Sequence, residues 1–99
     1  MEDSPAVYRF KVHGRVQGVS YRAFTAAEAE RLQLQGWVAN GRDGTVVGVA
    51  RGAPEALDGL HEALRRGPPA ARVEHVDWEA ADASDIVEAG FAIRPDVAG

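Results

Sequence analysis

Apolar and charged positions alternate along the first part of the chain, which predicts a β-strand over residues 6–13. Tyr8, Phe10 and Val12 form the apolar side of this strand. Two glycines then interrupt the pattern within residues 14–20, and a segment rich in Ala, Glu and Arg follows. Its apolar positions recur at helical spacing, so we expect a helix over residues 21–32 with a narrow buried stripe of Tyr21, Thr25, Ala29 and Leu32.

Two further strands and a second helix are expected in the middle of the chain. Residues 36–40 and 45–51 have strand patterns, and the Asp-Gly pair between them favours a hairpin, because glycine adopts positive φ at little cost. A helix is expected to begin at Ala53-Pro54, since proline is tolerated in a first turn. Its leucine face ends at Gly67, which is followed by two prolines.

The last third of the chain predicts two more strands. Residues 72–79 are strand-like, but Val73, Val76 and Trp78 depart from strict alternation, so we expect a β-bulge. The alanine- and acid-rich residues 80–89 indicate a solvated loop, and residues 90–94 a short final strand.

The order β-α-β-β-α-β plus a short final strand predicts a ferredoxin-like α+β sandwich. Such a fold has a mostly antiparallel sheet with two helices on one face. The length of 99 residues fits a single domain over residues 1–99.

Composition narrows the possible classes of function. No apolar run approaches the ~20 residues that a membrane helix needs, so no membrane partner is expected. The chain has no cysteine, which excludes disulfides and thiolate catalysis, and it shows no apolar secretory signal, so we expect a cytoplasmic protein. The net charge of −4 argues against nucleic-acid binding.

Basic residues nevertheless concentrate around the first loop. Four of the eleven Lys and Arg residues lie within one stretch of the chain: Arg9, Lys11, Arg15 and Arg22. This stretch leads into a helix start, where unsatisfied N–H groups and the positive end of the helix dipole bind anions. Gly14 and Gly18 permit close approach, and Arg22 can hold two phosphate oxygens at once. The same pattern also fits an ordinary strand-to-helix loop.

Asn40 and Trp37 belong to the second informative stretch. Asn40 ends a predicted strand just before the hairpin, a position where asparagine is common for local reasons. Trp37 lies among small apolar residues and fits the core. On these residues alone, both positions allow a purely structural interpretation. The three histidines have no partner at metal-ligand spacing, so no metal site is expected.

Two motifs make the chain resemble the acylphosphatase family. Residues 12–22 follow its first signature, apolar-x-Gly-x-Val-Gln-Gly-Val-x-aromatic-Arg, with Tyr21 where phenylalanine is usual and Ser20 where glycine is frequent. Residues 36–52 match the second signature throughout, from Gly36 through Asn40 to Gly52. The resemblance extends over about residues 6–94.

The resemblance implies an enzyme that hydrolyses the carboxyl–phosphate bond of acyl phosphates without metal or organic cofactor. It implies that Arg22 binds the phosphoryl group and that Asn40 orients the attacking water. The remaining phosphate-binding groups are expected to be amides of the loop, contributed by Arg15, Val16, Gln17, Gly18, Val19 and Ser20. We expect the Gln17 side chain to brace this loop. The expected partners are an acyl phosphate or phosphate itself, and the expected state is a monomer.

Two other classes of function are considered beside the enzyme. The first is a non-catalytic anion-binding or regulatory module, which the fold alone does not distinguish from an enzyme. The paired Arg22 and Asn40 favour the enzyme. The second is a nucleic-acid binder, which the acidic charge and the lack of adjacent aromatic pairs on the central strands disfavour.

Overall fold

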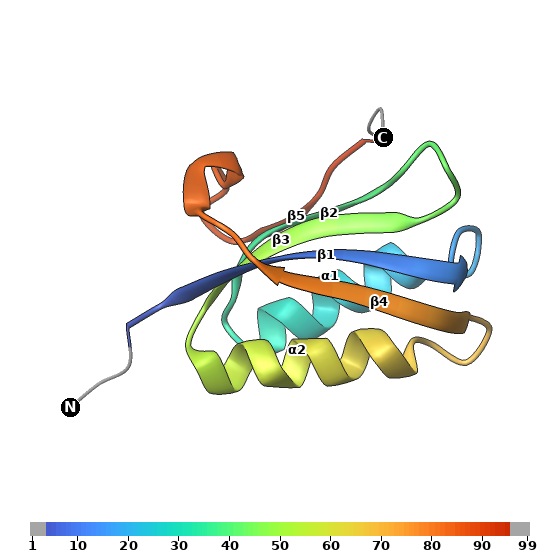
Figure 1. Ribbon diagram of the computed structural model, residues 1–99, viewed down its shortest axis with the longest axis horizontal. Helices are drawn as coiled ribbons and strands as arrows, with labels where there is room; N and C mark the ends of the chain where they lie inside the picture. The colour runs from blue at the N-terminus through green and yellow to red at the C-terminus, as the bar shows by residue number, and fades with distance from the viewer. Residues whose placement is uncertain (1–3, 96–99) are drawn as a thin grey trace.

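A five-stranded sheet with two helices packed on one face makes up the fold of residues 4–95, which a computed structural model describes (Figure 1). The elements are β1 (Ala6–Arg15), α1 (Tyr21–Arg31), β2 (Gln35–Asn40), β3 (Val46–Gly52), α2 (Pro54–Arg66), β4 (Arg72–Ala80), a 3₁₀ turn (Ala83–Asp85) and β5 (Phe91–Ile93). The strands lie in the order β4-β1-β3-β2-β5. The β2–β5 pair is parallel, whereas β1–β3, β1–β4 and β2–β3 are antiparallel. This is the expected ferredoxin-like sandwich.

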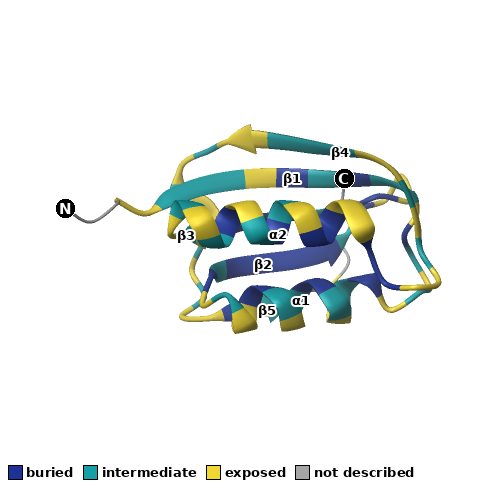
Figure 2. Ribbon diagram, turned by 90° about the horizontal axis from the view of Figure 1, so that it is seen from below, coloured by how far each residue is buried: buried dark blue, intermediate teal, exposed yellow. Residues whose placement is uncertain are grey.

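The main core lies between the two helices and the sheet (Figure 2). Phe10 and Val12 of β1 point into it, as the alternation predicts. The narrow stripe of α1 is buried at Tyr21, Thr25 and Ala29. The leucine face of α2 is buried as a whole, through Leu57, Leu60 and Leu64. Within the described residues, no helix is long and apolar enough to cross a membrane.

A β-bulge lies where β1 and β4 change register. His13 pairs with His75, whereas the next residue, Gly14, pairs with Val73, so Glu74 is the extra residue. The bulge expected in this strand is therefore confirmed, and it lets Val73 pack against the core although the alternation is interrupted. Gly14 has φ of 127°, and a Cβ there would lie 2.1 Å from the carbonyl oxygen of Arg72. No other residue fits this close approach of two strands.

A smaller apolar cluster lies on the opposite face of the sheet. Trp37 is buried, as expected, but it belongs to this second cluster rather than to the core beneath the helices. The predicted loop 80–89 contains the short 3₁₀ turn and covers the ring, since the Trp37 indole N–H donates to the carbonyl of Asp85 at 3.1 Å. The Arg94 guanidinium lies 4.3 Å from the centre of the Trp37 ring and pairs with Glu88 at 2.7 Å.

Tyr21 joins the two helices through a buried hydrogen bond. Its hydroxyl donates to the carbonyl oxygen of Leu64, near the end of α2. In a continuing helix this carbonyl would accept from the N–H of residue 68, but that residue is Pro68, which has none. The tyrosine hydroxyl takes the place of the missing donor. Burial raises the pKa of Tyr21, so the phenol keeps its proton.

Replacing Tyr21 with phenylalanine is expected to lower the free energy of unfolding by about 1–3 kcal/mol, because the buried Leu64 carbonyl loses its donor. Urea denaturation measures the change. Tyr8→Phe is the matched control, since the Tyr8 hydroxyl has no hydrogen-bond partner among residues 4–95. The control is expected to change stability by about 0.5 kcal/mol or less. Equal effects of the two substitutions would contradict the proposed role of the hydroxyl.

Candidate active site

The loop between β1 and α1 is shaped by two left-handed backbone conformations. Gly18 has φ of 74° and Ser20 has φ of 64°. They turn the chain from the end of β1 into the start of α1 (Figure 1). Ser20 is the N-cap of α1, but its side chain makes no capping hydrogen bond. The Ser20 side chain therefore leaves the first N–H groups of α1 uncapped. Uncapped N–H groups at the start of a helix are the groups that bind anions.

A cavity of about 200 Å³ opens beside this loop, on the face of the sheet that carries the helices. Residues of the loop, the first turn of α1, the end of β2 and the end of β5 line it, among them Val16, Gly18, Ser20, Arg22, Asn40 and Ile93. Arg22 and Asn40, the two catalytic residues expected from the sequence, thus line the same cavity although they belong to different elements.

Three of the expected phosphate-binding residues direct their side chains elsewhere. Arg15 is exposed at the end of β1, opposite Arg72. Val19 packs against the main core. The Gln17 amide donates to the carbonyl oxygens of Gly41 and Thr45, each at 2.9 Å. The expectation for these three residues concerned their backbone amides, and it stays a prediction.

Three residues that the sequence did not suggest also line the cavity. Tyr21 and Ala23 are the chain neighbours of Arg22 in the first turn of α1, so they lie at the cavity together with it. Ile93 reaches the site because β5 pairs in parallel with β2, which aligns Ile93 with Val38. Ile93 is 47% exposed. The alternation in residues 90–94 indicated the face on which Ile93 lies, but not the neighbouring strand.

Asn40 is held in place by the turn that follows it. The Gly41 N–H donates to the Thr45 carbonyl at 2.8 Å and closes the turn. Asp43 accepts from the hydroxyl of Thr45 and pairs with Lys11 of β1 at 3.1 Å. These hydrogen bonds, from Thr45 first and then from Lys11, lower the pKa of the Asp43 carboxyl well below its usual range. The Asp43 carboxylate is therefore ionised near neutral pH and can pair with Lys11 of β1.

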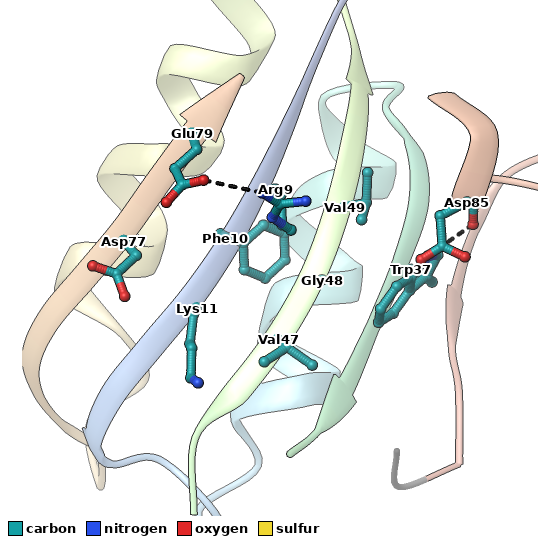
Figure 3. A pocket seen from close by; sticks show the side chains of 10 residues that line it. All are labelled: Arg9, Phe10, Lys11, Trp37, Val47, Gly48, Val49, Asp77, Glu79 and Asp85. Carbon is teal, nitrogen blue, oxygen red and sulfur yellow. Dashed lines mark hydrogen bonds and ion pairs between the residues drawn. The ribbon is translucent and has the colours of Figure 1, made fainter. Parts of the chain in front are cut away.

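A second cavity, of about 220 Å³, lies on the opposite face of the sheet (Figure 3). Its apolar lining residues are Phe10, Trp37, Val47 and Val49. Its charged groups have partners within the protein: Arg9 pairs with Glu79 at 3.0 Å, and Lys11 pairs with Asp43. The compensated charges make this face a poor match for a phosphoryl group.

Two histidines near this face contact the same aspartate. His13 and His75 each contact one carboxylate oxygen of Asp77, at 2.9 and 2.7 Å. These contacts lower the pKa of Asp77. Among residues 4–95, no group of three or more His, Asp or Glu side chains is arranged to hold a metal ion.

A family model, a sequence comparison and a structure comparison each find acylphosphatases. A family model described as Acylphosphatase matches residues 8–93. The acylphosphatase of Salinibacter ruber is 49% identical over 84 residues, which cover 85% of this chain and 87% of that protein. The solved structure of an acylphosphatase from Coxiella burnetii is similar with a TM-score of 0.84 and 39% identity, over 91% of this chain and 93% of that one. The acylphosphatase structure from Bacillus subtilis gives a TM-score of 0.83 at 35% identity, over 92% and 99% of the two chains.

Ser20 and Gln33 are the non-glycine residues with positive φ within residues 4–95, at 64° and 61°, and they lie at the two ends of α1. Ser20→Gly and Gln33→Gly are each expected to raise the free energy of unfolding by about 0.5–1 kcal/mol. A left-handed conformation costs a side chain roughly 1–2 kcal/mol, and the greater freedom of unfolded glycine offsets part of the gain.

Urea denaturation of both variants tests this prediction. Ala27→Gly, an exposed position inside α1, serves as the control and is expected to lower stability by about 1 kcal/mol. A Ser20→Gly protein no more stable than the wild type would show that the loop conformation carries no strain at this residue.

Proposed function

The chain belongs to the acylphosphatase family, and from this membership and the cavity beside the β1–α1 loop we propose that it hydrolyses acyl phosphates to a carboxylate and inorganic phosphate. One observation carries the proposal: Arg22 and Asn40 line the same cavity as the loop. The proposal includes a single monomeric domain, with residues 6–94 as its core, that acts in the cytoplasm on a small acyl phosphate.

The phosphoryl group binds to the loop amides of residues 15–20 and to Arg22. The positive φ values at Gly18 and Ser20 support this assignment, because curled loops direct successive N–H groups toward one point. The guanidinium of Arg22 contacts two phosphate oxygens with two parallel N–H groups. These groups stabilise the negative charge on the equatorial oxygens in the transition state.

Asn40 positions the attacking water in line with the bond that breaks. The leaving group is a carboxylate, which departs without needing a proton. Phosphoryl transfer through a loose transition state demands little of the nucleophile, so positioning and charge stabilisation account for most of the catalysis. The mechanism therefore needs no strong general base, no metal and no organic cofactor.

The place of Asn40 also favours an enzyme over an anion-binding module. A module that only holds phosphate needs the loop amides and Arg22. It gains nothing specific from an asparagine that lines the cavity at the end of β2. An enzyme that must orient water beside the bound phosphoryl group needs such a side chain.

The Asn40→Ala variant tests the role of the water-positioning amide. We expect kcat to fall on the order of 100-fold. The affinity for inorganic phosphate is expected to stay within about twofold of wild type, because the loop amides and Arg22 are unchanged. The assay follows release of phosphate and carboxylate from a synthetic aryl acyl phosphate, with a chelator present throughout.

Each result of this assay separates two interpretations. Turnover of Asn40→Ala within a few-fold of wild type would exclude the water-positioning role. A folded wild-type protein that binds phosphate but shows no turnover would refute the enzyme and favour the binding module. Loss of wild-type turnover in the chelator alone would contradict metal independence.

The Arg22→Lys variant tests the two-point contact with phosphate. Lysine keeps the charge but presents a single ammonium group, so we expect kcat/KM to fall on the order of 100-fold. Arg31→Lys is the matched control on the same helix, where the arginine is exposed and pairs with Glu28. Near-normal kcat and KM in Arg22→Lys would remove this residue from the site.

A further inference from the structure

The Gln17 side chain connects the β1–α1 loop, whose residues 15–20 form the proposed phosphate loop, to the turn that follows Asn40. Gln17 lies between Val16 and Gly18, two loop residues that line the cavity. Its amide nitrogen donates to the carbonyls of Gly41 and Thr45, at 2.9 Å each. Gly41 directly follows Asn40 in the chain. The half-buried Gln17 side chain thus reaches from the β1–α1 loop to Gly41, the residue next to Asn40.

The two carbonyls that accept from Gln17 form the base of the β2–β3 turn. Gly41 and Thr45 are already joined by a backbone hydrogen bond of 2.8 Å. Gln17 therefore holds both arms of the turn at once, from the side of the phosphate loop. Lys11 holds the same turn from β1 through Asp43. The turn, with Asn40 at its edge, is thus contacted from two directions, and the Lys11–Asp43 pair is the more exposed of the two contacts.

We propose that Gln17 is a positioning residue that sets the place of the Asn40 amide relative to the phosphoryl group. This inference rests on the proposed function. The Gln17 amide supplies two N–H groups from one nitrogen, and both are used on carbonyls of the turn. The bound phosphoryl group and the attacking water are held by different segments, and this side chain links them. Displacement by an ångström in such an arrangement costs on the order of 100-fold in rate.

A side chain that merely stiffens the loop would behave differently. It would hold the amides for phosphate, so its loss would weaken phosphate binding and turnover together. A residue that aligns Asn40 with the phosphoryl group affects kcat far more than phosphate affinity. The two roles are therefore distinguished by measuring both quantities on the same variant.

Gln17→Met keeps the length and shape of the side chain and removes both donors. We expect kcat for an aryl acyl phosphate to fall about 10- to 100-fold, with the Kd for inorganic phosphate changed by less than about twofold. Gln35→Met is the matched control, because the Gln35 amide also donates to a backbone carbonyl, that of Glu88 at 3.1 Å, outside the catalytic cavity. The control is expected to leave kcat and phosphate affinity unchanged.

Nuclear magnetic resonance gives an independent measure of the position of Asn40. Asn40 is the only asparagine in the chain, so its side-chain amide signal can be assigned by substitution. Phosphate is expected to shift this signal in the wild type and in Gln35→Met, and to shift it differently or broaden it in Gln17→Met. This measurement needs no turnover, so it still tests the link if the wild type proves inactive and the proposed function fails.

Three results would overturn the inference. They are an unchanged kcat in Gln17→Met, a parallel loss of kcat and phosphate affinity, and a fall in kcat with an Asn40 signal identical to that of the wild type. If the Met variant does not fold, Gln17→Ala replaces it, because water can then reach the two carbonyls. The same three results apply to that variant.

Discussion

The site depends on the backbone conformation of the loop that joins β1 to α1. Between Val16 and Ser20 the chain leaves a strand and enters a helix, and it does so with positive φ at Gly18 and Ser20. The same curl places the loop beside the cavity and brings Arg22 into the first turn of α1. A loop with ordinary negative φ values would change both the direction of the N–H groups and the start of the helix. Local backbone geometry thus governs both the proposed anion binding and the packing of α1.

Sheet register explains why this loop meets Asn40. β1 and β3 are antiparallel, and Val12 pairs with Val46, so the end of β1 lies beside the start of β3. The loop after β1 and the turn before β3 must therefore lie at the same end of the sheet. Gln17 then makes the direct link across this gap. The meeting of this loop with Asn40 is a consequence of strand pairing, completed by the Gln17 side chain.

Much of this architecture follows from the sequence because its signals are local. The alternation in residues 6–13, the leucine face of α2 and the broken pattern around Val73 each reflect a residue's immediate neighbours. The parallel placement of β5 does not, since three residues of alternation do not indicate which strand they join. For that reason Ile93 was not expected in the cavity. The burial of Trp37 follows from its small apolar neighbours, but its place on the second face does not, because the segment that covers it has no regular pattern.

The two departures from the family motif are explained by this structure without new chemistry. Tyr21 replaces the usual phenylalanine, and its hydroxyl donates to a Leu64 carbonyl that Pro68 leaves without a helical donor. The added hydroxyl therefore contributes to helix packing. Ser20 occupies a left-handed position, which accounts for the frequency of glycine there in the family. Its conformation is held by the loop and by α1, since the Ser20 carbonyl accepts from the N–H of Phe24 at 3.0 Å. Both departures act on the scaffold of the loop, while Arg22 and Asn40 retain the residue types that the proposed reaction requires.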